Sequence, residues 1–182
     1  IPHQLAKIDR NAIIGVMFSK IINWFSNIKN KFFRSIIELV TGIDKRVNLP
    51  KYNSETFTNH FEKNKYPIND DAPAKDRKAV IYSTCFVNFN KKDTGIAALK
   101  VLKKNGVKVQ NAYPGCCGMP FLEQADLPKV VEQAKRVSKD LLKWVDKGYE
   151  IITLTASCGL MLKFEWPLLL PEDENIKKLS KN

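Results

Sequence analysis

The sequence predicts an α/β protein, with a small parallel sheet and flanking helices preceded by an amphipathic helical segment. Two observations indicate this class. After residue 77, three short apolar runs alternate with helix-like stretches, an order typical of parallel strands joined by helices. Before it, apolar side chains recur at helical spacing between residues 11 and 41. We expect four parts: a helical segment at 1–50, a linker at 51–77, a cysteine-rich α/β domain at 78–171 and a tail at 172–182.

The N-terminal segment carries an apolar stripe flanked by basic residues, on one helix or on two helices joined near Asn30. The stripe residues share one helical face: Ile14, Phe18, Ile21, Trp24, Phe25 and Ile28. Polar residues interrupt the run, which is too polar to span a bilayer. Two interpretations stay open: a helix lying in a membrane interface, or a face that packs on the α/β domain or on a partner subunit.

Residues 51–77 lose the helical pattern and gather prolines and acidic residues, which is typical of a linker. Beyond this linker, short apolar runs predict strands at 78–84, 107–112 and 150–156. Because helical stretches separate them, we expect these strands to run parallel in one sheet.

The helices between and after the strands have recognisable ends. Those predicted at 93–106 and 126–148 each finish on a glycine, the usual C-terminal stop. A third helix begins at Gly159, and we expect Pro167 to interrupt it.

Charge restricts the class of partner. The chain has 30 Lys and Arg residues against 19 Asp and Glu, a net charge of +11. Such an excess indicates nucleic acid, an anionic membrane surface or an acidic protein face as partner. We do not expect nucleic acid, since the chain lacks zinc-finger spacing, a glycine-rich phosphate loop and RNP-like aromatic motifs.

The first residues of the chain indicate the cellular compartment of the protein. It carries no secretory signal and does not open on methionine, so we expect a fragment of a longer cytoplasmic protein. In that compartment the cysteines are reduced thiols or metal ligands rather than disulfides.

Each cysteine follows the end of a predicted strand: Cys85 the first, Cys116 and Cys117 the second, Cys158 the third. Because the carboxyl ends of parallel strands share one edge of a sheet, we expect the four thiols to meet there. Four thiols at one edge favour metal ligation over the alternative, four small buried side chains.

Three glycines flank these cysteines: Gly115, Gly118 and Gly159. Without Cβ atoms, they allow backbone N–H groups to approach the sulfurs. Structural zinc sites usually use closely spaced cysteine pairs that this chain lacks. A catalytic thiol needs a base, and both histidines, His3 and His60, precede the α/β part. We therefore expect no catalytic residue.

Three motifs carry a resemblance to a known family: CFVNFN, YPGCCGMPF and TASCGLMLKFEWPLLL. They resemble the cysteine-rich CCG domain of the heterodisulfide reductase B subunit and its relatives. Among these relatives, the chain is most similar to the electron-transfer subunits of anaerobic glycerol-3-phosphate dehydrogenases, whose first CCG domain is preceded by a stretch similar to IDKRVNLPKYNSETF.

The resemblance implies an electron-transfer subunit at the cytoplasmic face of a membrane. Electrons would come from a flavin-bearing dehydrogenase subunit, pass through a four-iron cluster on Cys85, Cys116, Cys117 and Cys158, and continue towards membrane quinone. Oxidation of the substrate would belong to the flavin subunit. The family's full-length chain would add a ferredoxin-like domain before this piece and a second CCG domain after it.

The chain departs from the family at one position. The full motif ends in two cysteines spaced C-x-x-C, and its five cysteines hold a noncubane four-iron cluster. Here Met161 stands in the fifth position, and a thioether is a poor iron–sulfur ligand compared with a thiolate. A four-cysteine cluster, zinc or no metal stay open. A metal-free or zinc-bearing docking module is therefore the alternative function.

Overall fold

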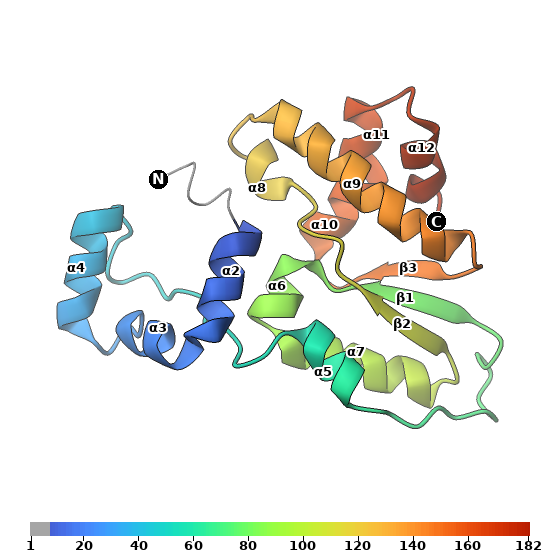
Figure 1. Ribbon diagram of the computed structural model, residues 1–182, viewed down its shortest axis with the longest axis horizontal. Coiled ribbons are helices and arrows are strands. Elements are labelled where there is room, and N and C mark those ends of the chain that lie inside the picture. The colour runs from blue at the N-terminus through green and yellow to red at the C-terminus, as the bar shows by residue number, and fades with distance from the viewer. Residues whose placement is uncertain (1–7) are drawn as a thin grey trace.

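The computed structural model describes residues 8–182 and confirms the predicted α/β class. Its centre is a three-stranded parallel sheet in the order β2-β1-β3 (Figure 1). The strands are β1 (Lys78–Tyr82), β2 (Lys108–Ala112) and β3 (Glu150–Thr153). The central strand β1 pairs with both neighbours and is buried from its second residue to its last, which explains its continuous apolar sequence.

Helices cover both faces of the sheet (Figure 1). The two predicted helices between the strands are present as α7 (Lys92–Lys104) and α9 (Leu127–Val145). Side chains alternate along β1, so Ile81 packs in one core with Leu99 of α7, whereas Tyr82 packs in the other core under α9. The sheet thus separates two apolar cores and holds its carboxyl edge between them.

The stretch predicted to be a linker contains a helix, α5 (Phe57–Lys63). Phe57 is fully buried in the core with Leu99, where Gly95 leaves room for its ring. Asn88 accepts a 3.0 Å hydrogen bond from the backbone N–H of Thr58, in the first turn of α5. This segment packs on the sheet domain through contacts that its proline-rich and acidic composition concealed.

The helix after β3 is not broken at Pro167, contrary to the prediction. It continues from α10 (Ala156–Leu160) through a π-helical turn, η1 (Met161–Glu165), into α11 (Trp166–Leu169). A proline in a regular helix clashes with the carbonyl four residues earlier. The wider π turn immediately before Pro167 accommodates the ring, and the helix ends at Leu170.

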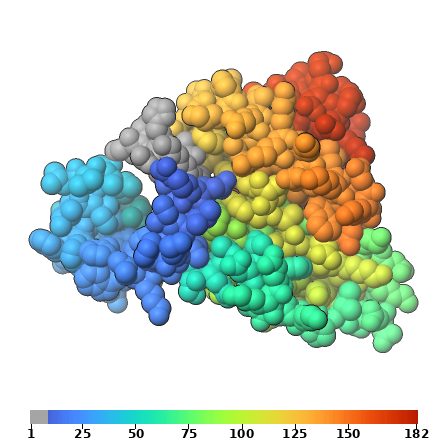
Figure 2. Space-filling view, viewed as in Figure 1, coloured from blue at the N-terminus to red at the C-terminus, as the bar shows by residue number. Residues whose placement is uncertain are grey.

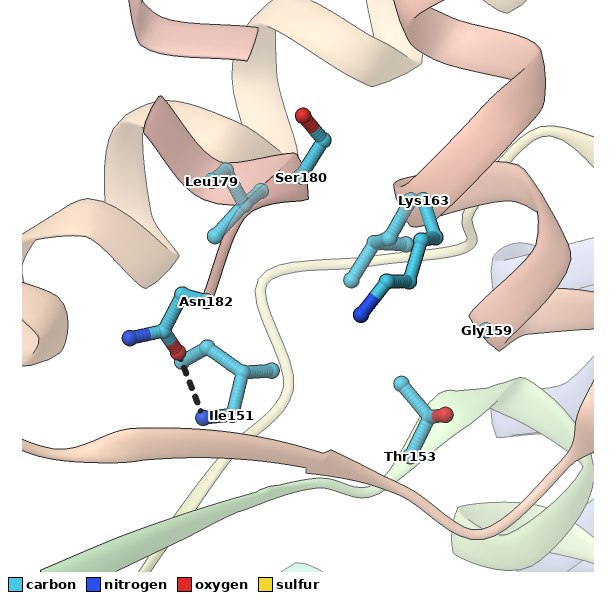
Figure 3. Close-up of a pocket in the computed structure, with 8 residues that line it drawn as sticks. Ile151, Thr153, Gly159, Lys163, Leu179, Ser180 and Asn182 are labelled. Carbon is cyan, nitrogen blue, oxygen red and sulfur yellow. Dashed lines mark hydrogen bonds between the residues drawn. The ribbon is translucent and has the colours of Figure 1, made fainter. Parts of the chain in front are cut away.

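The predicted tail forms a helix, α12 (Glu174–Ser180). Its side chains Ile176 and Leu179 are buried in the core under α9. Beyond it, the Asn182 side-chain oxygen accepts a 2.8 Å hydrogen bond from the backbone N–H of Ile151 on β3 (Figure 3). The C-terminal segment therefore covers part of the sheet's exposed edge.

Three helices make up the N-terminal region, defined here as residues 8–50: α2 (Ile8–Met17), α3 (Ser19–Phe25) and α4 (Lys31–Thr41). The predicted joint near Asn30 separates α3 from α4, and Phe18 adds a second break. α2 contacts α6 (Thr84–Phe89), whereas α3 and α4 lie farther from the sheet (Figures 1 and 2). No helix in the described part of the chain is long and apolar enough to cross a membrane.

Two sets of contacts hold α3 in place. Asn23 makes a paired hydrogen bond with the backbone of Tyr52, at 2.8 and 2.9 Å, which ties the helix to the segment leading into α5. Trp24 and Phe25 contact the ring of Phe33 on α4, with centroids 5.2 and 4.5 Å apart. The region is thus organised by a few specific contacts and a small aromatic cluster.

Candidate metal centre

Each cysteine lies just beyond the carboxyl end of a strand, as predicted. Cys85 is in the first turn of α6 after β1, and Cys158 lies within α10 after β3. Cys116 and Cys117 occupy the loop between β2 and the short helix α8 (Met119–Leu122). After the first and third strands, helices begin almost at once, so Cys85 and Cys158 are both helical residues.

The structure brings the four sulfurs together in a row. The Cys85 and Cys116 sulfurs lie 3.9 Å apart, and those of Cys117 and Cys158 lie 3.2 Å apart. A hydrogen bond between Cys116 and Cys117 joins the two pairs. Three of the four side chains are buried, and Cys85 is half-buried. The predicted meeting of the cysteines at one sheet edge is confirmed.

The backbone around the adjacent cysteines explains how both sulfurs reach one site. Gly115 and Gly118 have φ values of +135° and +91°, a region that L side chains rarely adopt. The Tyr82 hydroxyl donates a 2.7 Å hydrogen bond to the carbonyl of Gly115, and the Trp166 indole N–H donates one of 3.1 Å to the carbonyl of Cys117. Two buried aromatic side chains therefore fix the turn that aims the sulfurs.

The thiols differ in their electrostatics. Hydrogen bonds from the Cys117 and Cys85 thiols lower the pKa of Cys116, helped by the backbone N–H of Gly118 and the positive charge of Arg136. The same hydrogen bonds, together with burial, raise the pKa of Cys85 and Cys117 above the ordinary value. The cluster therefore favours one thiolate, on Cys116, stabilised by its neighbours.

The flanking glycines have three different surroundings. Gly118 lends its N–H to the Cys116 sulfur, as expected from the sequence. A Cβ atom on Gly115 would clash with the guanidinium of Arg136, so this glycine makes room for a basic side chain. A Cβ atom on Gly159 would lie 2.9 Å from the hydroxyl oxygen of Thr153, so Gly159 allows α10 to approach β3.

Three polar residues beside the cysteines were not identified from the sequence. The Tyr113 hydroxyl donates a 2.5 Å hydrogen bond to Asp9 of α2, and Arg136 of α9 forms a 3.5 Å ion pair with the same carboxylate. Burial and the charge of Asp9 raise the pKa of Tyr113. Asp9 and Tyr113 are 104 residues apart, and no local motif links them. Together these residues join the N-terminal region to the cysteine edge.

The donor set fits a thiolate-bound metal in chemical type, since soft sulfur ligands suit zinc and iron–sulfur clusters. In a tetrahedral thiolate site the sulfurs lie about 3.8 Å apart. The distance of 3.9 Å between Cys85 and Cys116 meets this value, and 3.2 Å between Cys117 and Cys158 is shorter. Within residues 8–182, no three Cys, His, Asp or Glu side chains are already arranged to hold a metal ion. Side-chain rotation would have to accompany ligation.

Met161, at the position of the missing fifth cysteine, is fully buried. It packs in the same core as Trp166 and the three buried cysteines. The side chain thus fills apolar space beside the cysteine edge, where a flexible thioether packs well.

The predicted N-terminal stripe is exposed along its whole length. Its residues show between 36% and 56% of their surface to solvent: Ile14, Phe18, Ile21, Trp24, Phe25 and Ile28. The stripe therefore belongs to neither core of the sheet domain and is open to solvent in the described chain.

Comparison with known proteins places the cysteine edge in a family. Residues 79–163 match the family model described as a cysteine-rich domain, CCG. They form a CCG domain. The match begins in β1 and ends in η1, so it contains all four cysteines of the chain. No solved structure gave a significant match.

Three curated relatives illustrate the family's range. The C subunit of anaerobic glycerol-3-phosphate dehydrogenase from Escherichia coli is 29% identical over 171 residues, 93% of this chain. The B subunit of fumarate reductase (CoM/CoB) from Methanothermobacter marburgensis is 34% identical over 89 residues, 47% of this chain. An uncharacterised iron–sulfur protein of Methanocaldococcus jannaschii is 30% identical over 126 residues, 66% of this chain.

The first relative extends the similarity to the N-terminal region as well as the CCG domain. This chain nevertheless spans only 42%, 17% and 25% of the lengths of these three proteins, respectively. The relatives are, by name, a dehydrogenase subunit, a reductase subunit and an iron–sulfur protein. The chain is therefore similar to subunits of two oxidoreductases and to an iron–sulfur protein.

Proposed function

We propose that this chain is an electron-transfer piece of an oxidoreductase complex, in which Cys85, Cys116, Cys117 and Cys158 ligate an iron–sulfur cluster. The observation that carries the proposal is the meeting of all four cysteines, in sulfur contact, at the carboxyl edge of the CCG sheet. When bound, such a cluster supplies one-electron transfer. The named iron–sulfur relative supports this choice of metal.

The surrounding residues have distinct tasks in this proposal. Cys116 enters as the ready thiolate, and the positive charge of Arg136 offsets the negative charge that ligation gathers at the edge. Tyr82 and Trp166 hold the carbonyls of the cysteine loop, which keeps Cys116 and Cys117 on one side of the chain. The buried core around them limits access of water to the sulfurs.

The proposed complex resembles that of the glycerol-3-phosphate dehydrogenase relative. Electrons come from a flavin-bearing dehydrogenase subunit and pass towards membrane quinone. A ferredoxin-like domain and a second CCG domain belong to the same full-length chain. Similarity over 93% of this chain to the C subunit of that dehydrogenase, of which it spans 42%, supports this assembly.

We place this complex at the cytoplasmic face of the membrane, with the exposed stripe in the interface. The positive net charge of the chain and the solvent exposure of the stripe support this. Co-sedimentation with anionic vesicles tests it: Phe18→Glu combined with Phe25→Glu should abolish binding. Unchanged binding would assign the stripe to a protein partner instead.

Reconstitution tests the metal site. The 182-residue chain, incubated anaerobically with ferrous iron and sulfide, should turn brown and retain iron after desalting. Cys116→Ser combined with Cys117→Ser should lose both properties, because two thiolate ligands are removed. Met161→Leu is the matched control, since this buried thioether lies outside the proposed ligand set. Iron retained by the double serine variant would contradict the assignment.

A second function has one observation in its favour. The Cys117 thiol donates a 3.2 Å hydrogen bond to the Cys158 sulfur, a contact that needs no metal. In this alternative the domain is a metal-free or zinc-bearing docking module of the same complex. Elemental analysis of anaerobically purified chain separates the two: stoichiometric zinc, or a melting temperature unaffected by iron and sulfide, would support the docking module.

A further inference from the structure

A cavity of about 420 Å³ lies beside α4. None of the residues that line it belongs to the cysteine edge. It is lined on one side by α4 and the end of the loop before it, and on the other by the turn that follows α4. The lining residues are Ile28, Lys31, Arg34, Ser35, Lys45 and Arg46. Four of these six residues carry a positive charge, and the cysteine site does not account for this concentration of charge.

Arg34 is the fully buried member of this set. Its guanidinium donates hydrogen bonds to the carbonyls of Lys45, Asp44 and Val47, at 3.3, 3.0 and 2.7 Å. These bonds fold the turn back against α4. The remaining nitrogen, Nη1, is buried and has no hydrogen-bond partner among residues 8–182. A buried charge with an unsatisfied donor is costly, and the negative charge of an anion bound nearby would offset part of that cost.

The charges around the cavity do not balance. Glu38 forms a 3.6 Å ion pair with Lys45, and Asp44 pairs with Arg46 at 2.6 Å. Two acidic groups thus face four basic ones, so two positive charges are in excess. The lysine and arginine side chains at the rim are exposed and therefore accessible to a ligand from solvent. The excess positive charge favours the binding of an anion such as a phosphate group.

The neighbouring face of α4 is apolar and exposed. Its members lie on one side of the helix, next to the face that lines the cavity: Phe32, Ile36, Leu39 and Val40. Leu39 is 86% exposed, and Ile28, of the predicted stripe, itself lines the cavity. An anion in the cavity and an apolar chain on this face would therefore be bound side by side, the layout of an anionic lipid.

We infer that this cavity is a phosphate-binding site, formed by Lys31, Lys45 and Arg46 around the buried Arg34. The phosphate is that of an anionic lipid headgroup, or a free phosphate of the same chemistry. The inference is independent of the cysteine site. If the phosphate belongs to a lipid, the inference rests on the proposed membrane location and names the residues that would bind the headgroup.

The test compares two double variants of the 182-residue chain. Lys31→Ala with Lys45→Ala removes two charges from the cavity, and Lys135→Ala with Lys139→Ala removes two exposed charges from α9. Binding is measured to vesicles of phosphatidylglycerol in phosphatidylcholine by co-sedimentation, and to inorganic phosphate by calorimetry. The cavity variant should bind the vesicles or inorganic phosphate about tenfold more weakly than the unchanged chain. The α9 variant should bind each of them with the affinity of the unchanged chain.

The two arms separate the sources of phosphate. Weaker vesicle binding by the cavity variant, without competition from inorganic phosphate, identifies the lipid headgroup. Calorimetric binding of inorganic phosphate that the cavity variant loses, with vesicle binding unchanged, identifies a free phosphate. Equal behaviour of the two variants towards both ligands overturns the inference. None of these results depends on iron, so failure here leaves the proposed redox function untouched.

Discussion

The N-terminal region and the CCG domain place their large apolar side chains in opposite ways. Among the described residues, 19 large hydrophobic side chains are exposed, and 13 of them lie between Ile13 and Val47. Of the buried hydrophobic residues in the described chain, Ala12 is the only one that precedes Phe57. The CCG domain therefore has a core of its own, whereas the N-terminal region keeps its shape through local contacts and offers an apolar surface.

This difference indicates two kinds of stability in one chain. The sheet and its helices depend on the hydrophobic effect within the chain. The helices α3 and α4 depend on hydrogen bonds such as those of Arg34 and on a small aromatic cluster. An exposed apolar surface of this kind would be stabilised by any ligand or partner that covered it.

Trp166→Ala should produce the largest effect, because it removes a fully buried ring from the CCG core and its hydrogen bond to Cys117. We expect the free energy of unfolding to fall by about 3–5 kcal/mol. Phe32→Ala, at a residue 71% exposed, is the matched change in the other region and should alter it by less than about 0.5 kcal/mol. Urea unfolding followed by circular dichroism measures both. Equal losses would break the comparison.

Arg34→Met should loosen the N-terminal region alone. Losing three charged hydrogen bonds should lower the local opening free energy of residues 31–47 by about 2 kcal/mol. Hydrogen–deuterium exchange should show faster exchange there and unchanged protection in β1. Lys29→Met, an exposed substitution nearby, is the control. Faster exchange throughout β1 would show that the two regions unfold as one.

Asp9→Asn tests the join between the two regions. The substitution weakens the hydrogen bond from Tyr113 and removes the ion pair with Arg136, at a cost of about 1 kcal/mol. We expect faster hydrogen exchange in α2 and unchanged thermal unfolding of the CCG domain. Asp70→Asn, at an exposed position, should change neither. Equal exchange in α2 for both variants would show that Asp9 does not hold the helix.

The smallest expected effect is a pH dependence of stability that comes from Glu55, next to the start of α5. Hydrogen bonds from Lys92 and His60 lower the pKa of Glu55 below its ordinary 4.5. A lowered folded-state pKa contributes stability above pH 4.5, and this contribution is lost as the pH falls through the folded value. Because Glu55 is largely solvated, the contribution is below about 1 kcal/mol. Between about pH 7 and about pH 3, the melting temperature should fall less for Glu55→Gln than for the unchanged chain. Identical falls in melting temperature would contradict this.

Much of the CCG domain was predictable because its signals are local. Three apolar runs separated by helical stretches predicted the parallel sheet, and Gly106 and Gly148 marked helix ends where the backbone does adopt positive φ. The cysteines followed from the same pattern, since their positions after the strands place them at one edge. Pro167 misled the prediction because the π turn before it depends on hydrogen bonding that the residue type does not reveal.

Periodicity and residue spacing were enough to predict the α/β class, the meeting of Cys85, Cys116, Cys117 and Cys158, and the apolar stripe. Other features become visible only in the folded chain: α5 and α12 pack on the sheet, Asp9 reaches Tyr113, and Arg34 is buried beside a basic cavity. These features arise from contacts between elements that are separate along the chain. Such contacts depend on how the elements pack, and no local pattern of residues records them.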